Sequence, residues 1–216
     1  MDPDKARQKA HRQRRVARAE GVLLGVLSQI GPGDLALDCG ANTGTITTRL
    51  ADTGAEVHAF EPDPAAAEAL HQAVEGRSNV TLHRAAVGVA DGTARLMRGE
   101  GFADDPLVTS RRSTIVPGAT RIDPAHGVEV EVVDLIARLK TWAARPAGIA
   151  FLKLDVEGAE LDILTEMLRH DLFAQIRLTV AELHPYKFPA LRPEFQALRK
   201  TVAARYPETR VWLDWI

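Results

Sequence analysis

The segment Leu37–Gly44, "LDCGANTG", combines residue types that suit a bound ligand. Gly40 and Gly44 lie four residues apart, and glycine lets a backbone approach a ligand closely because it has no side chain. This spacing differs from the G-x-G-x-x-G of dinucleotide sites, and no Lys-Ser/Thr pair follows Gly44 as a phosphate loop requires. Asp38 would also repel an anion. The segment therefore favours a ligand with an ammonium group over one with a phosphate.

A second acidic residue, Glu61, ends the next apolar run, "AEVHAFE". A carboxylate in that position can accept hydrogen bonds from both hydroxyls of a ribose, as the acidic residue of dinucleotide sites does. The two segments together indicate a ligand with an amino-acid head, a ribose and a base.

Residues that could move a proton follow two later apolar runs. "FLKLDVEGAELDIL" contains Asp155, Glu157 and Glu160, and "AELHP" contains Glu182 and His184. His184 has the unperturbed pKa best suited to accepting a proton near neutral pH, whereas Glu160 is expected to cap a helix. Asp155 with Glu182 or His184 could instead bind Mg²⁺, although the pattern alone does not favour a metal.

The stretch from 99 to 126 is rich in Gly, Pro, Asp, Ser and Arg and shows no regular period, so we expect a long loop there. Within it, "TSRRST" contains Arg111 and Arg112. The segment is either a solvated loop or a lid in which these arginines bind an acidic or phosphorylated substrate.

Strands and helices are expected to alternate along the rest of the chain, which predicts an α/β fold with a doubly wound, mostly parallel sheet and helices on both faces. Ligands of such sheets bind beyond the carboxyl ends of the strands, near the switch point in strand order. The polar residues described above fall at such ends. The expected strands are 34–39, 55–61, 80–83, a pair within 85–96, 128–133, 149–155, 176–183 and 210–215.

Composition fits one globular domain in a chain of 216 residues with a formal net charge of −2. The one cysteine, Cys39, excludes an internal disulfide and suits a reducing cytoplasm. No apolar run reaches the roughly 18 residues of a membrane span. We therefore expect a cytoplasmic protein without a membrane segment; a homo-oligomer is left open.

Residues 1–32 are predicted to form a basic helical extension to a domain spanning 33–216. The extension is either a solvated helix face or a clamp for a phosphate, a carboxylate or RNA. No aromatic residues are interleaved with its charges, which argues against binding single-stranded nucleic acid by stacking. Its basic residues are Lys5, Arg7, Lys9, Arg12, Arg14, Arg15 and Arg18.

Four segments in order resemble a known family. "LALDCGANTGTIT" and "VHAFEPDP" resemble motifs I and II of class I S-adenosylmethionine-dependent methyltransferases. "FLKLDVEGAELDIL" and "AELHP" resemble, more narrowly, the FkbM family, whose signature is K-x-D-x-E-G-x-E; Lys153 to Glu160 fill each of its places. The resemblance covers roughly residues 35–185.

The resemblance implies a Rossmann-like class I fold and methyl transfer from S-adenosylmethionine, usually to a hydroxyl of a sugar or another small natural product. It also implies cofactor contacts, with Asp155 beside the sulfonium. The other implied contacts are Asp38, Gly40, Asn42 and Gly44 with the methionine part, Glu61 and Pro62 with the ribose, and Ala85, Ala86 and Val87 with the adenine.

For the catalytic step the candidates are His184, Asp155 and Glu157, with Arg111, Arg112 and Glu182 on the side of a hydroxylated small-molecule acceptor. Nucleic acid is not the expected partner. Two alternatives stay open: an RNA methyltransferase that uses the basic helix, and a protein that binds S-adenosylmethionine without catalysis. Class I sheets normally close with an antiparallel seventh strand, which we expect to be missing or shortened here.

Overall fold

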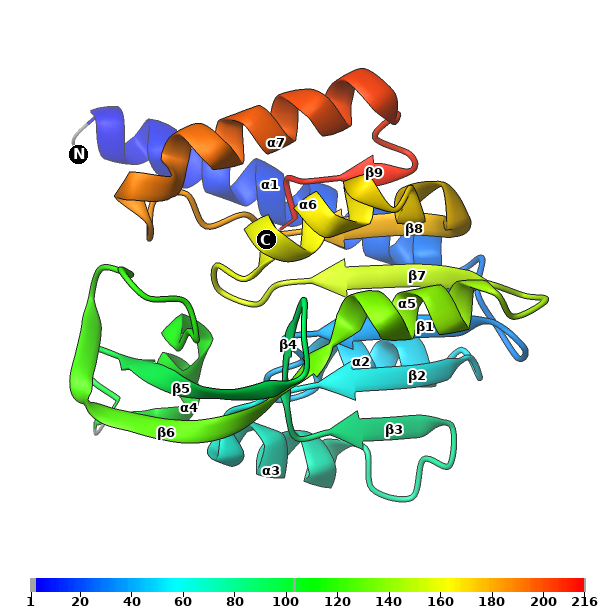
Figure 1. Cartoon of the computed structure of the whole chain (residues 1–216), viewed down its shortest axis with the longest axis horizontal. Helices are drawn as coiled ribbons and strands as arrows, with labels where there is room; N and C mark the ends of the chain where they lie inside the picture. The colour runs from blue at the N-terminus through cyan, green and yellow to red at the C-terminus, as the bar shows by residue number, and fades with distance from the viewer. Residues whose placement is uncertain (1–2, 103, 216) are drawn as a thin grey trace.

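The computed structural model describes residues 3–102 and 104–215, and its main sheet has six strands in the order β3-β2-β1-β7-β8-β9 (Figure 1). Every pair of neighbours is parallel, so the predicted doubly wound fold is confirmed. The strand order reverses between β1 and β7, which is the switch point. The strands are β1 Leu35–Cys39, β2 Glu56–Phe60, β3 Val80–His83, β7 Ile149–Leu154, β8 Ile176–Ala181 and β9 Val211–Trp212.

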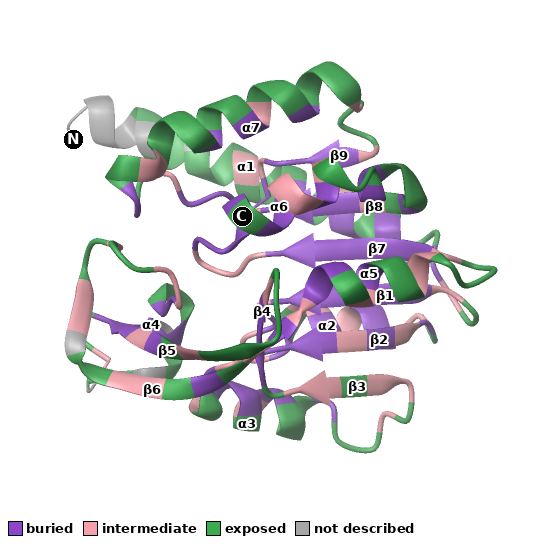
Figure 2. Ribbon diagram, in the orientation of Figure 1, coloured by how far each residue is buried: buried purple, intermediate pink, exposed green. Residues whose placement is uncertain are grey.

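Helices cover both faces of this sheet. One hydrophobic core joins it to α5 (Leu135–Ala143), α6 (Glu160–Arg169) and α7 (Arg192–Arg205). A second core joins the opposite face to α1 (Pro3–Leu27) and α2 (Thr45–Ala51), and α3 (Pro64–Ala73) packs beside it. β1 and β7 are therefore buried along their whole length, whereas the edge strand β3 is half-exposed (Figure 2).

Helix α1 packs only its C-terminal half on the sheet, through Leu23 and Val26. Its basic N-terminal half reaches the C-terminal end of the chain, where Arg15 donates to the carbonyl of Trp215 and the guanidinium of Arg18 lies 4.9 Å from the ring centre of Trp212. Across residues 3–102 and 104–215, none of the helices, α1 included, is both long enough and apolar enough to cross a membrane.

A small second sheet corrects the strand pair predicted within residues 85–96. Strands β4 (Ala86–Gly88) and β5 (Gly92–Gly99) do not pair with each other, because β6 (Ile122–Asp134) lies between them, parallel to β4 and antiparallel to β5. The carboxylate of Asp91 accepts a hydrogen bond from the backbone N–H of Asp134. This hydrogen bond holds the turn at Asp91 against the end of β6, and the turn does not close a hairpin between β4 and β5.

The segment 99–126 also contains regular structure that the sequence did not predict. It includes α4 (Pro106–Thr109), a turn of 3-10 helix at Ser110–Arg112, and the beginning of β6, which starts six residues before the predicted Val128. Thr114 and Met97 exchange backbone hydrogen bonds. A register shift between Leu96 and Arg98 interrupts the alternation of inward-facing and outward-facing residues that marks a strand. The sequence therefore did not reveal this pairing.

The sixth strand of the main sheet, β9, is shorter than predicted. Only Val211 and Trp212 pair with β8, where residues 210–215 were predicted. Within the described part of the main sheet there is no antiparallel seventh strand; an isolated antiparallel bridge joins Glu182 and Asp214 at this edge.

Gly40 fits at the switch point because the backbone approaches so closely there. Its φ is +78°, and an added Cβ would lie 1.8 Å from the backbone oxygen of Asp155. Gly33 has a φ of +93°, but an added Cβ would meet nothing within 4 Å. A substitution at Gly33 therefore measures the cost of backbone strain alone.

We expect Gly40→Ala to lower the free energy of unfolding by at least about 3 kcal/mol, because strain and a backbone clash add. Gly33→Ala should cost only about 1–2 kcal/mol, since strain alone operates there. Urea unfolding of both variants measures the difference, and equal losses would contradict the close approach.

Candidate active site

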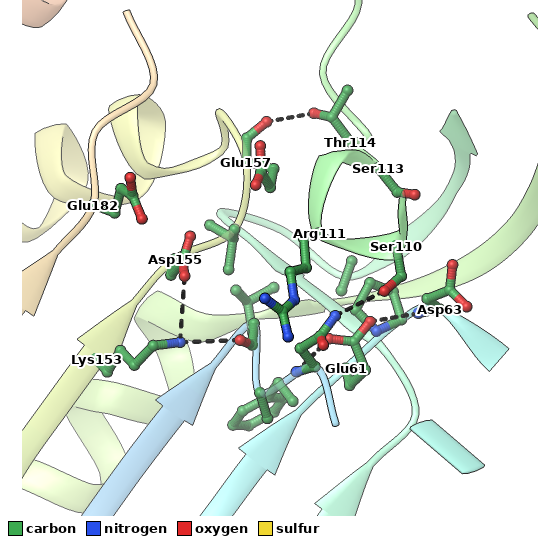
Figure 3. Close-up of a pocket in the computed structure, with 18 of the residues that line it drawn as sticks. Glu61, Asp63, Ser110, Arg111, Ser113, Thr114, Lys153, Asp155, Glu157 and Glu182 are labelled. Atoms are coloured by element: carbon green, nitrogen blue, oxygen red, sulfur yellow. Dashed lines mark hydrogen bonds and ion pairs between the residues drawn. The ribbon is translucent and has the colours of Figure 1, made fainter. Parts of the chain in front are cut away.

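A cavity of about 670 Å³ lies beyond the carboxyl ends of the central strands, at the switch point (Figure 3). Most of the predicted site residues meet there, whereas Asp38, Gly44 and Arg112 do not line it. The predicted residues that line it are Gly40, Asn42, Glu61, Pro62, Ala85, Ala86, Val87, Arg111, Asp155, Glu157, Glu182 and His184.

The loop after β1 forms one wall of the cavity. The backbone N–H groups of Gly40 and Ala41 both donate to the carbonyl of Phe60, which ties the loop to the end of β2. Asn42 adopts a left-handed backbone, and its Nδ2 donates to Ser110 Oγ at 2.9 Å. Its Oδ1 is buried and has no hydrogen-bond partner among the described residues. The wall thus keeps one acceptor atom for a ligand to satisfy.

Asp38 lies beneath the cavity instead of lining it, which corrects the expected direct contact with a ligand. Its carboxylate accepts from Thr47 Oγ1 at 2.7 Å and from Lys153 Nζ at 3.1 Å. Burial alone would lower the pKa of Lys153, but Asp38 and Asp155 outweigh it and raise that pKa. Lys153 also donates to the carbonyl of Gly40, so Asp38 acts through Lys153 on the loop.

Gly44 is likewise structural. It precedes the first residue of α2 with a φ of +88°, and an added Cβ would lie 2.7 Å from Leu70 Cδ1. Its missing side chain lets α2 pack against α3.

Glu61 is held at the end of β2 by two backbone donors. Asn42 N–H donates to Oε2 and Asp63 N–H donates to Oε1, each at 2.8 Å. Burial raises the pKa of Glu61 to about 7, although the Asn42 N–H favours its charged form. Each carboxylate oxygen has a further lone pair that can accept from a ligand hydroxyl.

The second sheet and the short helices supply lining residues that sequence reasoning missed. Asp63, the N-cap of α3, lines the cavity and pairs with the buried Arg98 of β5, whose guanidinium lies 3.9 Å from the ring centre of Phe102. Ser110, Ser113 and Thr114 line the cavity from the segment where a loop was expected. Their only sequence signal is their position beside the predicted arginines.

The two arginines of that segment separate. Arg111 extends into the cavity from the short 3-10 helix (Figure 3). Arg112 turns away from the lining, and its backbone carbonyl accepts from Lys187 Nζ. Arg12 and Arg15 of α1 also line the cavity, so the basic helix contributes to the site at its N-terminal half.

His184 is buried among carboxylates at the opposite end from Glu61. Its Nδ1 lies 3.1 Å from Glu160 Oε1, and its Nε2 lies 3.5 Å from Glu157 Oε2 and 3.8 Å from Asp155 Oδ1. Burial alone would lower the pKa of His184, but Glu160, Glu157 and Asp155 outweigh it and raise that pKa to about 10. An imidazolium donates a proton rather than accepting one, so this arrangement gives the predicted general base no support.

Glu160 does not cap α6 as predicted, because the N-cap is Ala159 without a side-chain cap; Glu160 is the first residue of α6 and fixes the turn between β7 and α6. Its carboxylate accepts from the backbone N–H groups of Val156 and Gly158, each at 2.7 Å. Glu157 has a left-handed φ of +58° within this turn and pairs with Lys187 at 2.9 Å. Glu182, at the end of β8, faces the same space, and burial together with nearby Asp155 raises its pKa to about 7.

A doubly wound sheet with its cavity at the switch point is the architecture expected of a class I methyltransferase. Residues 38–206 match the Methyltransferase FkbM domain, and the chain therefore belongs to the FkbM methyltransferase family.

Among solved structures, the chain is similar to "Methyltransferase FkbM" from Methylobacillus flagellatus KT, with 18% identity and a TM-score of 0.37. The match covers 64% of this chain and 29% of that one, so this chain spans less than a third of the length of the protein it resembles. A search of curated proteins finds no match.

Removing the Lys153 ammonium should leave the Asp38 carboxylate buried in the core without its cationic partner. We expect Lys153→Met to lower the free energy of unfolding by about 3–5 kcal/mol, because a buried charge loses its partner. Asp38→Asn in the same chain should recover part of that loss. A double-mutant cycle by urea unfolding measures the coupling, and strictly additive losses would contradict the ion pair.

Proposed function

We propose that the protein transfers a methyl group from S-adenosylmethionine to a hydroxyl of a small molecule. The observation that carries this proposal is the Glu61 carboxylate, presented by two backbone N–H groups at the switch point of a doubly wound sheet. Membership of a methyltransferase family supports the same reaction class.

The residues present fit that cofactor. Glu61 can accept from both ribose hydroxyls, and Asn42 Oδ1 can accept from the ammonium of the methionine part. Ala86 and Val87 offer an apolar surface beyond β3 for the adenine.

When bound, S-adenosylmethionine supplies an electrophilic methyl group on a sulfonium. The protein must align the acceptor hydroxyl, exclude water and take the hydroxyl's proton. The wall from Ser110 to Thr114 closes one side of the cavity, and Thr114 Oγ1 fixes it to the carbonyl of Glu157 at 2.6 Å. Glu182 makes no side-chain hydrogen bond within residues 3–102 and 104–215, and we assign it as the proton acceptor.

Cofactor binding tests the proposal directly. We expect Glu61→Ala to weaken binding of S-adenosylhomocysteine by at least about 10-fold, because each hydrogen bond to a charged group contributes about 1.5–3 kcal/mol. Isothermal titration calorimetry measures this. The exposed Glu75 gives a matched control, and Glu75→Ala should leave the affinity unchanged.

The affinity for S-adenosylhomocysteine should also depend on pH. Because Glu61 accepts from both hydroxyls only when ionised and its pKa is about 7, wild-type affinity should fall as the pH drops through that value. Glu61→Gln should bind weakly at every pH and lack this Glu61-dependent slope. An unchanged affinity in both Glu61 variants would remove the ribose assignment.

Proton removal should depend on Glu182. We expect Glu182→Gln to lower turnover about 10²–10⁴-fold, the usual contribution of a general base, while cofactor affinity stays within about 2-fold. Release of S-adenosylhomocysteine in a screen of hydroxylated acceptors measures turnover and identifies the acceptor. If Glu182→Gln turned over as fast as the wild type, another residue would have to accept the proton.

The alternatives make different predictions. An RNA methyltransferase would bind RNA with a steep salt dependence through the basic half of α1. A binding protein without catalysis would bind the cofactor fully but release no product across the acceptor screen. A cytoplasmic location remains part of the proposal, since Cys39 is buried and unpaired.

A further inference from the structure

We propose that Asp155, Glu157 and His184 form a binding site for a divalent metal ion at the acceptor end of the cavity. The ligand atoms of these three residues lie within 4.8 Å of one another, and all three residues line the cavity. The set differs from the one considered from sequence, because Glu157 takes the place of Glu182.

The distances suit one shared ion. His184 Nε2 lies 3.5 Å from Glu157 Oε2 and 3.8 Å from Asp155 Oδ1. Two ligands held about 2.1 Å from a tetrahedral ion are about 3.4 Å apart, so small side-chain movements bring all three atoms into the coordination shell. The same two separations are too long for good hydrogen bonds between these groups.

The orientation of His184 is an independent indication. The residue is 1% exposed, and its Nε2 faces the two carboxylates without a hydrogen bond from any described residue. Its Nδ1 can donate to Glu160, whose carboxylate is itself fixed by the N–H groups of Val156 and Gly158. A ligating histidine almost always donates its other ring N–H in this way, which directs the Nε2 lone pair at the metal.

The surrounding charges also favour a cation. Asp155, Glu157, Glu160 and Glu182 lie near the imidazole. Two ammonium groups face this cluster, since Lys187 pairs with Glu157 and Lys153 Nζ lies 3.8 Å from Asp155 Oδ2. Lys187 contacts Glu157 Oε2, so an ion must share that oxygen or take Oε1. The left-handed backbone of Glu157 holds its side chain on the cavity side of the turn, which is a strained arrangement often retained for function.

One nitrogen and two oxygen ligands suit Mn²⁺, Zn²⁺ or Mg²⁺ and leave open positions for an acceptor. An ion there would bind the acceptor hydroxyl and lower the pKa of its proton. This role rests on the proposed function, whereas metal binding to the protein alone does not. The two can therefore fail separately.

The test is titration of the full chain with Mn²⁺ alone, followed by electron paramagnetic resonance and calorimetry. We expect one ion per chain and an electron spin echo modulation from a histidine nitrogen. His184→Gln should abolish the nitrogen modulation, and Asp155→Asn and Glu157→Gln should each weaken binding at least about 10-fold. Zn²⁺ and Mg²⁺ should compete for the same site.

Two control variants distinguish Mn²⁺ binding at this site from nonspecific attraction of the cation to exposed polar groups. Asp162→Asn removes an exposed carboxylate from α6 and His71→Gln removes an exposed imidazole, and both should bind Mn²⁺ as the wild type does. The modulation measured on the wild type does not depend on any variant folding. No Mn²⁺ binding up to millimolar concentration, binding without nitrogen modulation, or equal binding by all the ligand variants would overturn the proposal and leave an ion-paired imidazolium.

Discussion

The ion pair between Lys153 and Asp38 joins the two strands whose carboxyl ends form the site. The two residues are register partners in the parallel pair β1–β7, and both are almost fully buried. Lys153 also donates to the carbonyl of Gly40, so one ammonium connects β7, β1 and the loop that follows it. Neither charge is stable there alone, because an unpaired buried ion is costly. The positions of the loop and of Glu61, to which Asn42 N–H donates, follow from this contact.

Acidic residues in and beside the cavity differ in their hydrogen-bond partners. Glu160 accepts from two backbone N–H groups and fixes a turn, whereas Glu61 accepts from two others and keeps lone pairs for a ligand. Glu182 has no such donor among the described residues and is the carboxylate most free to take a proton. The same residue type thus has different hydrogen-bonding capacity left for a ligand, according to how many of its lone pairs the backbone already uses.

The sequence predicted the main sheet well because parallel strands buried on both faces are continuous apolar runs that end in polar residues. Many of the residues that it singled out line the cavity at the switch point, but Asp38, Gly44 and Arg112 do not. It misassigned Asp38, because a side chain one position inside the strand end points into the core, where its partner Lys153 comes from another strand. The second sheet was missed because β4 and β5 both pair with the distant strand β6, and a register shift interrupts the pairing of β5. Such pairings leave no local period.

The placement of α1 was beyond sequence reasoning for a related reason. Its apolar residues predicted a helix, but only tertiary packing through Leu23 and Val26 directs its basic half to the cavity. Arg12 and Arg15 therefore line the same cavity as Arg111, Glu61 and Glu182. The cavity wall thus combines cationic side chains from α1 and the short 3-10 helix with carboxylates that follow the strands. A helix that the sequence assigns to a separate extension is therefore part of the cavity wall.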